Sequence, residues 1–198
     1  MNFKRFLSFL SVASIMAYMV PVVYAANMTS VKDTLSNSAP DTASNHGMQF
    51  NTPSGVAADG SIKVVFPTEF DLTTTALGVE DFDFTVNSAE QTLVVGSAPG
   101  ASEIEVDLSN DDTGVIVFDL GSGVSLPAGA AVSIEIGTNA TSGGTGDTQI
   151  VNPTTTGSKT ISFTSHTSDD GSGASVDEGA AVVSINNTVS VTDRKSVV

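Results

Sequence analysis

The sequence predicts an all-β protein, specifically an Ig-like antiparallel β-sandwich of about nine or ten strands. The first observation is the stretch from Ala101 to Thr138, where apolar residues alternate with acidic or small polar ones in successive runs. The second is that clusters of Gly, Pro, Asn and Asp separate short apolar runs. The third is that no helical period follows the first 25 residues. Strand spacing does not distinguish this topology from a jelly roll, which remains the alternative.

Three runs within 101–138 predict which side chains form the core. An alternating strand turns every second residue inward, and the run from Val115 to Leu120 is apolar on nearly both faces, so neighbours should cover it. We expect buried side chains at Ile104, Val106, Val117, Phe118, Ile134 and Ile136. We expect exposed side chains at Glu105, Asp107 and Glu135.

Residues 1–25 are typical of a secretory signal peptide. Lys4 and Arg5 provide the positive start, the following residues are largely apolar, and the segment ends in Val-Tyr-Ala. The mature chain would therefore begin at Ala26 and be secreted or held at the cell surface, with no membrane contact after cleavage. An uncleaved membrane anchor is the alternative, and Pro21 in the apolar run favours cleavage.

Residues 26–47 form a polar segment that we interpret as an N-terminal arm or edge strand, and residues 48–192 as the sandwich. Within the arm, Val31, Asp33 and Leu35 share one strand face. The sandwich would begin with a hairpin that pairs residues 48–51 with 61–66. Further strands are expected at 81–86, 91–95, 159–165 and 181–192, with a surface loop rich in glycine at 141–147.

The last six residues, 193–198, are identical to the translation of a common sequencing adaptor. We interpret them as an artefact of sequencing, after which the natural gene would continue. On this interpretation Asp193, Arg194 and Lys195 have no functional meaning.

Charge and composition exclude several classes of function. There are 22 acidic and 7 basic residues, for a formal net charge of −15, and such a surface repels nucleic acid and anionic lipid. The chain has no cysteine, which excludes disulfides, thiolate metal sites and cysteine nucleophiles.

One acidic segment near the C-terminus is the best candidate for a cation site. It contains Asp169, Asp170, Asp177 and Glu178 in a context rich in Gly and Ser. Calcium prefers six to eight oxygen ligands, but the spacing departs from the EF-hand pattern because its third and fifth positions lack acids. We therefore expect solvated turn residues and no cofactor, with calcium at these four acids as the alternative.

No pattern in the chain predicts catalysis, and we expect that the protein is not an enzyme. His46 and His166 lie far apart in sequence, no Gly-x-Ser-x-Gly motif is present, and both histidines are predicted to be ordinary polar loop residues. Tryptophan is absent, so the tryptophan platform common in carbohydrate-binding modules is missing. A glycan is still one of the partners that we consider.

Three segments resemble a known class of proteins: residues 33–72, 126–141 and 149–163. The first includes Gly60, a strand, Phe66-Pro67 and then Phe70. In these residues the chain is similar to secreted Ig-like repeat proteins on the surfaces of bacteria, mostly of candidate phyla, and archaea, over about 29–192. The resemblance implies a cell-surface or extracellular protein and supplies no catalytic residues.

These observations lead to one function and two alternatives. The first is an exported, non-enzymatic Ig-like module of a cell-surface, fibre or adhesion protein, whose partners are other surface proteins or copies of itself. The second is a filament subunit whose arm, Asn27 to Ser38, inserts as a strand into a neighbouring copy. The third is a carbohydrate-binding module of a larger protein.

Overall fold

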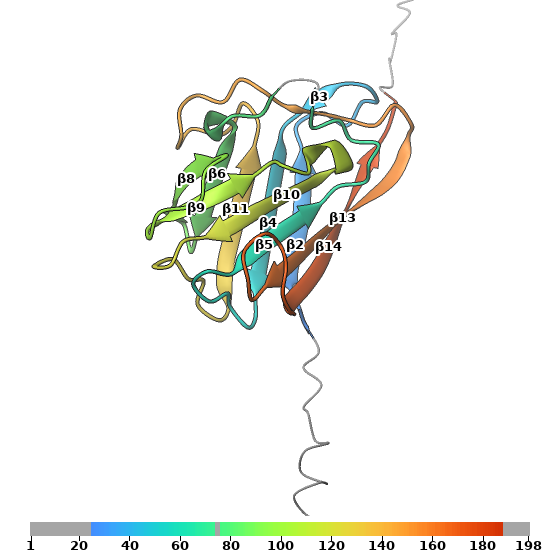
Figure 1. Ribbon diagram of the computed structural model, residues 1–198. Coiled ribbons are helices and arrows are strands. Elements are labelled where there is room, and N and C mark those ends of the chain that lie inside the picture. The colour runs from blue at the N-terminus through green and yellow to red at the C-terminus, as the bar shows by residue number, and fades with distance from the viewer. Residues whose placement is uncertain (1–24, 74–75, 188–198) are drawn as a thin grey trace, which may run out of the picture.

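Two β-sheets face each other across one apolar core in the computed structural model, which describes residues 25–73 and 76–187 (Figure 1). The large sheet has the strand order β1 (Ala26–Asn27), β14 (Ser175–Ile185), β13 (Gly157–His166), β5 (Ser61–Val65), β10 (Val115–Leu120), β9 (Glu103–Asp107) and β8 (Thr92–Val95). The small sheet has the order β2 (Thr29–Leu35), β4 (His46–Thr52), β11 (Ala130–Ile136), β6 (Phe82–Val86) and β7 (Ala89–Glu90).

The remaining elements are short. A two-stranded ribbon pairs β12 (Ile150–Val151) with β3 (Ala43–Ser44), and two 3-10 turns, η1 (Val79–Asp81) and η2 (Asp111–Thr113), precede β6 and β10. The predicted all-β class is confirmed, since the described residues contain no α-helix. None of their helices is long and apolar enough to span a membrane.

The core between the sheets consists of the inward residues of alternating strands. All six residues predicted to be buried are at most 3% exposed. Phenylalanines from both sheets meet there, with ring centroids 5.2 Å apart for Phe50 and Phe163 and 5.3 Å for Phe84 and Phe118. Alternation therefore identified the core face of β9 and β11. On β10, Phe118 belongs to the core, whereas its neighbour Val117 lies on the outer face under the β13–β14 turn.

The prediction that Glu105, Asp107 and Glu135 are exposed was wrong, because each is only partly exposed. Asp107 lies beside Asp170 of the β13–β14 turn, which comes back over the outer face of the large sheet. Glu135 lies on β11, between β4 and β6, so neighbouring strands shield it on both sides.

The expected hairpin of residues 48–51 with 61–66 was also wrong. β4 belongs to the small sheet and β5 to the large one, so the segment between them crosses the sandwich. Within that segment, Val56 forms an isolated bridge with Leu126. The run from Ala130 crosses in the same way, because β9 and β10 pair in the large sheet while β11 lies in the small one. Alternation is the same in either sheet and does not specify the partner strand.

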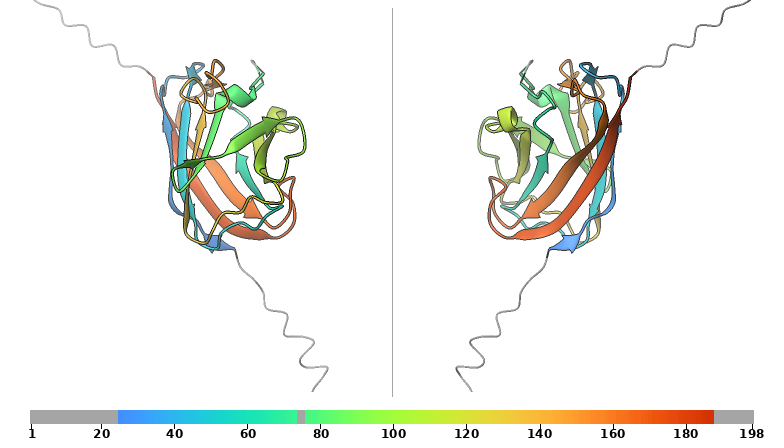
Figure 2. Two further views of the ribbon diagram at one scale, coloured as in Figure 1. Left: turned by 90° about the vertical axis from the view of Figure 1, so that its left-hand side faces the viewer. Right: turned by 90° about the vertical axis from the view of Figure 1, so that its right-hand side faces the viewer.

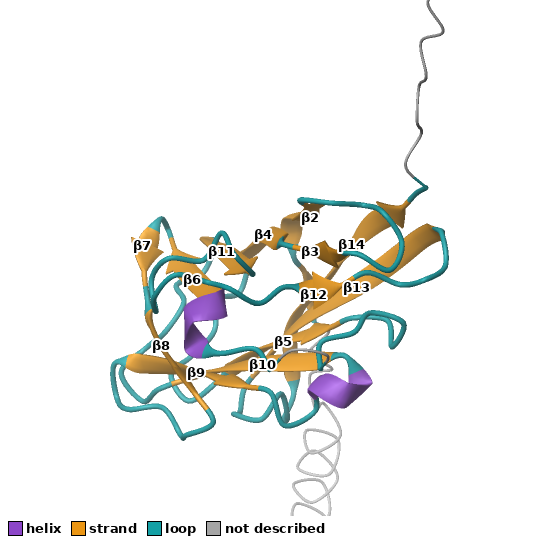
Figure 3. Cartoon of the chain, turned by 90° about the horizontal axis from the view of Figure 1, so that it is seen from above, coloured by secondary structure: helices purple, strands orange, loops and turns teal. Residues whose placement is uncertain are grey.

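Each lateral edge of the sandwich is bordered by a chain segment that pairs with both sheets. β1 runs parallel to β14, and Met28 N–H donates to the Glu178 carbonyl at 2.7 Å, after which β2 pairs with β4. On the opposite side, β7 pairs with β6 and β8 runs parallel to β9. Figure 3 shows the large sheet curving so that β14 approaches β2. These crossings shorten the open strand edges.

The two long C-terminal strands run obliquely across the strands of the small sheet (Figure 2). The strand predicted at 181–192 is instead β14, which begins at Ser175 because it pairs with β13 along nearly its whole length. Its predicted continuation to Val189 and Val191 lies outside the described residues, as do residues 1–24 of the expected signal and residues 193–198.

Candidate functional site

Four buried aspartates bind backbone amides of loops and turns that are distant in sequence. They are at most 8% exposed and lie on or next to the strands β6, β10 and β14: Asp81, Asp83, Asp119 and Asp177. A buried carboxylate is costly unless hydrogen bonds replace its water shell, and here backbone N–H groups do so. Asp177 was expected to be a solvated turn residue, and that expectation was wrong because its side chain is fully buried.

The loop at 141–148 shows this arrangement most clearly. Asp83 accepts hydrogen bonds from the amides of Thr141 (2.9 and 3.0 Å) and Ser142 (2.7 Å). Asp81 accepts from the amides of Asp147 and Thr148, both at 2.8 Å. The segment predicted as a free surface loop is therefore held at both ends by β6 and the turn before it.

A second group of acids forms a pocket under the β13–β14 turn. We call it the acidic pocket; its volume is about 350 Å³, and its charged lining consists of Asp59, Glu105, Asp119, Asp169 and Asp170. The turn is fixed to the sheet at two points. Asp170 N–H donates to Asp119 Oδ1 at 2.7 Å, and Ser61 Oγ donates to the Ser168 carbonyl at 2.7 Å.

Burial and charge repulsion raise the pKa values of two acids of this pocket, Asp119 and Glu105. Desolvation raises the pKa of Asp119 to about 7, and the charges of Asp170, Glu105 and Asp107 contribute, while the hydrogen bond from Asp170 N–H opposes the shift. Desolvation, with Asp107 and Asp170, also raises the pKa of Glu105. A carboxyl with a pKa near neutrality exchanges protons at physiological pH.

The predicted cation ligands are not brought together. Asp170 lies with Asp107 and Asp119, whose ligand atoms are within 4.8 Å of one another, and Asp169 lines the same pocket. Asp177 is buried on β14, where its carboxylate accepts the Ser54 amide at 3.1 Å, and Glu178 is exposed on that strand. The four acids of the alternative calcium site therefore do not form one cluster, because β14 starts before Asp177 and only Asp169 and Asp170 belong to the turn.

Sequence reasoning missed Asp107 and Asp119 as neighbours of Asp170. The two strands that carry them are paired, with Val117 opposite Asp107. Asp170, in the turn that contacts them, lies 51 residues after Asp119 in the sequence. A second acidic group that could hold a cation, Glu80, Asp81 and Asp147, is likewise built from two distant segments. No local spacing signals either group.

His46 is a core residue and not the loop residue that we expected. It lies on β4, 1% exposed, with its ring edge-on to Phe66 at 5.2 Å between centroids. Its Nδ1–H donates to Asp33 Oδ2 at 2.7 Å, and both side chains are fully buried. Its Nε2 has no hydrogen-bond partner among the described residues. The side chains of the pair are therefore shielded from solvent.

Asp119, Ser61 and His166 form one cross-strand row on the outer face of the large sheet, with Ser61 paired to each of the others. Their order resembles the members of a catalytic triad, but the hydrogen bonds differ. Ser61 Oγ donates to the Ser168 carbonyl and not to His166, and neither ring nitrogen of His166 has a hydrogen-bond partner in the described residues. The row lacks the bond between nucleophile and base that activates a serine.

No model of a protein family matches this sequence, and no curated protein matches it either. Among solved structures, the fold is similar to the crystal structure of BslA, a bacterial hydrophobin. The TM-score is 0.43 with 10% sequence identity, and the similarity covers 85% of this chain and 100% of the other.

Proposed function

We propose that this chain is an exported, non-enzymatic β-sandwich module of a cell-surface, fibre or adhesion protein. In this proposal a rigid scaffold presents loops to other surface proteins or to copies of the same chain. The observation that carries it is the use of buried aspartates to fix loops at both ends of the sandwich.

A carboxylate that binds two backbone amides restricts a loop more than solvent contacts do. Asp83 and Asp81 hold the two ends of the loop at 141–148, and Asp177 holds the segment at Ser54. Preordered loops lose less conformational entropy when they bind a partner, so this arrangement favours recognition. Such loops also resist proteolysis, which is useful outside the cell.

Two further hydrogen bonds, which fix the β13–β14 turn, support a non-enzymatic function. Asp119 and Ser61 are the groups that a hydrolase would need free, and both are occupied in fixing the β13–β14 turn. The Ser61 side chain is also fully buried. A substrate could not reach this hydroxyl unless the turn first left the sheet.

Strand donation to a neighbouring copy is less well supported. β1 pairs with β14, and β2 with β4, within the same chain. Donation would require both sets of ladder hydrogen bonds to break before new ones form, which costs free energy that an already free arm would not lose.

Export is tested by expressing the full chain in a bacterial host and sequencing the N-terminus of the protein recovered outside the cytoplasm. We expect a mature chain that begins at Ala26 and is accessible to protease added outside intact cells. Recovery of Met1 in the cytoplasm would contradict export. Recovery of a chain that begins at Met1 in the membrane fraction would indicate an uncleaved, membrane-anchored protein.

A further inference from the structure

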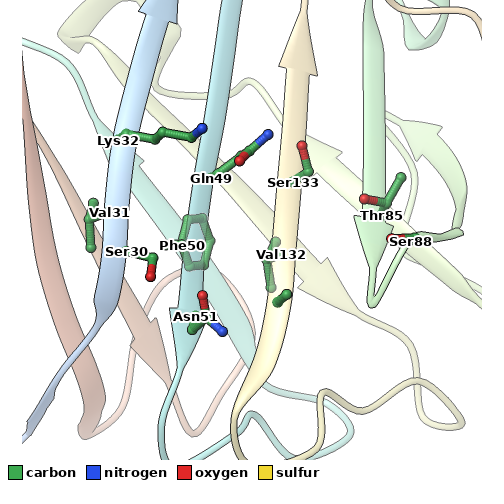
Figure 4. A pocket seen from close by; sticks show the side chains of 11 residues that line it. Ser30, Val31, Lys32, Gln49, Phe50, Asn51, Thr85, Ser88, Val132 and Ser133 are labelled. Atoms are coloured by element: carbon green, nitrogen blue, oxygen red, sulfur yellow. The ribbon is translucent and has the colours of Figure 1, made fainter.

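The outer face of the small sheet contains a polar groove of about 550 Å³ that crosses β2, β4, β11 and the end of β6 (Figure 4). We call it the outer-face groove. The backbone pairing places four of its side chains in one row, because Lys32 faces Gln49, Gln49 faces Ser133 and Ser133 faces Thr85. Partners in register project from the same face of a sheet, so these groups line one surface.

The groove depends on a local irregularity of β2. Its pairing with β4 slips between Thr29 and Lys32, and Ser30 there has a positive φ of 55°. A bulge bends an edge strand and redirects its side chains. In Figure 4 the Lys32 side chain extends from β2 toward Gln49 on β4. The small side chains of Ala131 and Ser133 leave the floor between β4 and β6 open.

The polar side chains of the groove have no hydrogen-bond partners within residues 25–73 and 76–187. Among the described residues, no side-chain hydrogen bond involves the groove side chains of Lys32, Gln49, Asn51, Thr85, Ser88 or Ser133, in contrast to the acids that hold the loops. Amide and hydroxyl groups that are free, aligned and exposed can exchange hydrogen bonds with water for hydrogen bonds with a ligand.

We infer that the outer-face groove binds a neutral saccharide. Amides and hydroxyls both donate and accept hydrogen bonds, as sugar hydroxyls do, and their spacing across neighbouring strands matches an extended polyhydroxylated ligand. The volume falls in the range of about 300–1,000 Å³ found for ligand sites. This inference extends the proposed surface module by giving it a ligand and a binding face.

Two features favour this ligand over the other classes. A polyanion would be repelled by a chain of net charge −15, and Glu90, paired with Thr85, adds a negative charge at one end of the row. A protein partner would need apolar anchors, but Phe50 and Val132 turn into the core, where they are 1% and 2% exposed. The backbone groups of β4 and β11 are already paired on both sides.

The absence of an exposed aromatic ring in the groove limits the affinity. Hydrogen bonds to sugars replace hydrogen bonds to water, so each contributes little, and no ring stacks on the sugar. We expect a dissociation constant of about 1 mM for a single site. Surface modules displayed in many copies compensate for such weak sites by multivalency.

Amide NMR spectra of the isotope-labelled, secreted chain test the inference, with cellohexaose, maltohexaose and chitohexaose as neutral probes and an oligogalacturonate as the anionic one. We expect at least one neutral probe to shift the amide signals of Gln49, Ser133 and Thr85. The double variant Gln49→Ala, Ser133→Ala should lose these shifts. The matched variant Ser162→Ala, Thr164→Ala, which alters the outer face of the large sheet, should keep them.

Three results would overturn the inference: no shift with any neutral probe, shifts that persist in the Gln49→Ala, Ser133→Ala variant, or binding of the oligogalacturonate alone. In the last case the shifts would disappear in Lys32→Ala and at high salt, which identifies an anion site. Thermal unfolding of each variant verifies that it is folded. Because the export experiment measures the N-terminus and this one measures binding, the two proposals can fail separately.

Discussion

The Oδ1 atom of Asp119 accepts a hydrogen bond of 2.7 Å from the backbone N–H of Asp170, which joins the middle of the large sheet to the tip of its longest hairpin. The bond brings the Asp170 carboxylate close to those of Asp119 and Asp107. One contact thus orders the turn and concentrates negative charge. The first prediction follows from this coupling.

We predict that Asp119 makes the folded protein less stable as the pH rises. Its ordinary pKa of 3.8 is raised to about 7 in the fold, so the folded state retains a proton that the unfolded state releases. The free energy of unfolding should therefore fall between about pH 4 and pH 7. Because solvent at the pocket mouth screens the charges, we expect a loss of about 1–2 kcal/mol rather than the full shift.

The variant Asp119→Asn keeps an oxygen that accepts the Asp170 amide and cannot ionise. It should match the natural chain at about pH 4 and exceed its stability at about pH 8, as measured by urea unfolding. Asp112→Asn, at an exposed position of η2, is the control and should leave the pH profile unchanged. A profile for Asp119→Asn that parallels the natural one would exclude Asp119 as the source.

A second prediction concerns Asp83 and the loop at 141–148. Replacement by alanine leaves the amides of Thr141 and Ser142 without their acceptor, and this should cost about 1–3 kcal/mol of stability. Hydrogen exchange at these two amides should become faster, while the core strands stay protected. Thr85→Ala, two residues further along β6, removes no side-chain hydrogen bond among the described residues and should not alter the exchange. Equal exchange in both variants would contradict the loop-fixing role.

Two glycines provide a matched test of the loop that follows β4. Gly55 and Gly96 both have positive φ values, 75° and 66°. A Cβ atom added at Gly55 would lie 2.5 Å from the Leu126 carbonyl oxygen, whereas a Cβ atom added at Gly96 would have no neighbour within 4 Å. Gly96→Ala should cost about 1 kcal/mol from backbone conformation alone, and Gly55→Ala about 2–4 kcal/mol. Similar denaturation midpoints for the two variants would show that the 53–60 segment is packed differently.

A fourth prediction is that folding does not require calcium. Asp119, which lines the acidic pocket, has a pKa raised to about 7 and is partly protonated at neutral pH. Asp177 already accepts a hydrogen bond from the Ser54 amide. Calorimetry with a chelator and then with millimolar calcium should give the same unfolding temperature. A stabilisation of about 2.7 kcal/mol at a hundredfold excess over the dissociation constant, lost in Asp107→Ala, Asp170→Ala, would establish a site there.

The alternation of side chains determined the fold class and the core. Ile104 and Ile134 could be assigned to the interior without knowing their neighbours, because strand geometry turns every second residue to one face. The tip of the β9–β10 hairpin also depends only on local sequence, because Asn110, Asp111 and Asp112 lie at the turn that joins two consecutive strands.

Only the tertiary structure decided which strands pair and what the acids do. β4 and β5 carry the same pattern that a hairpin would, yet they lie in different sheets. In the sequence, Asp83 and Asp119 cannot be distinguished from solvated acids. Their partners are backbone amides of segments 58 and 51 residues away, which only the folded chain brings to them. Periodicity acts over a few residues and specifies a face, whereas a buried carboxylate is satisfied by whichever loop the packed sheets bring to it.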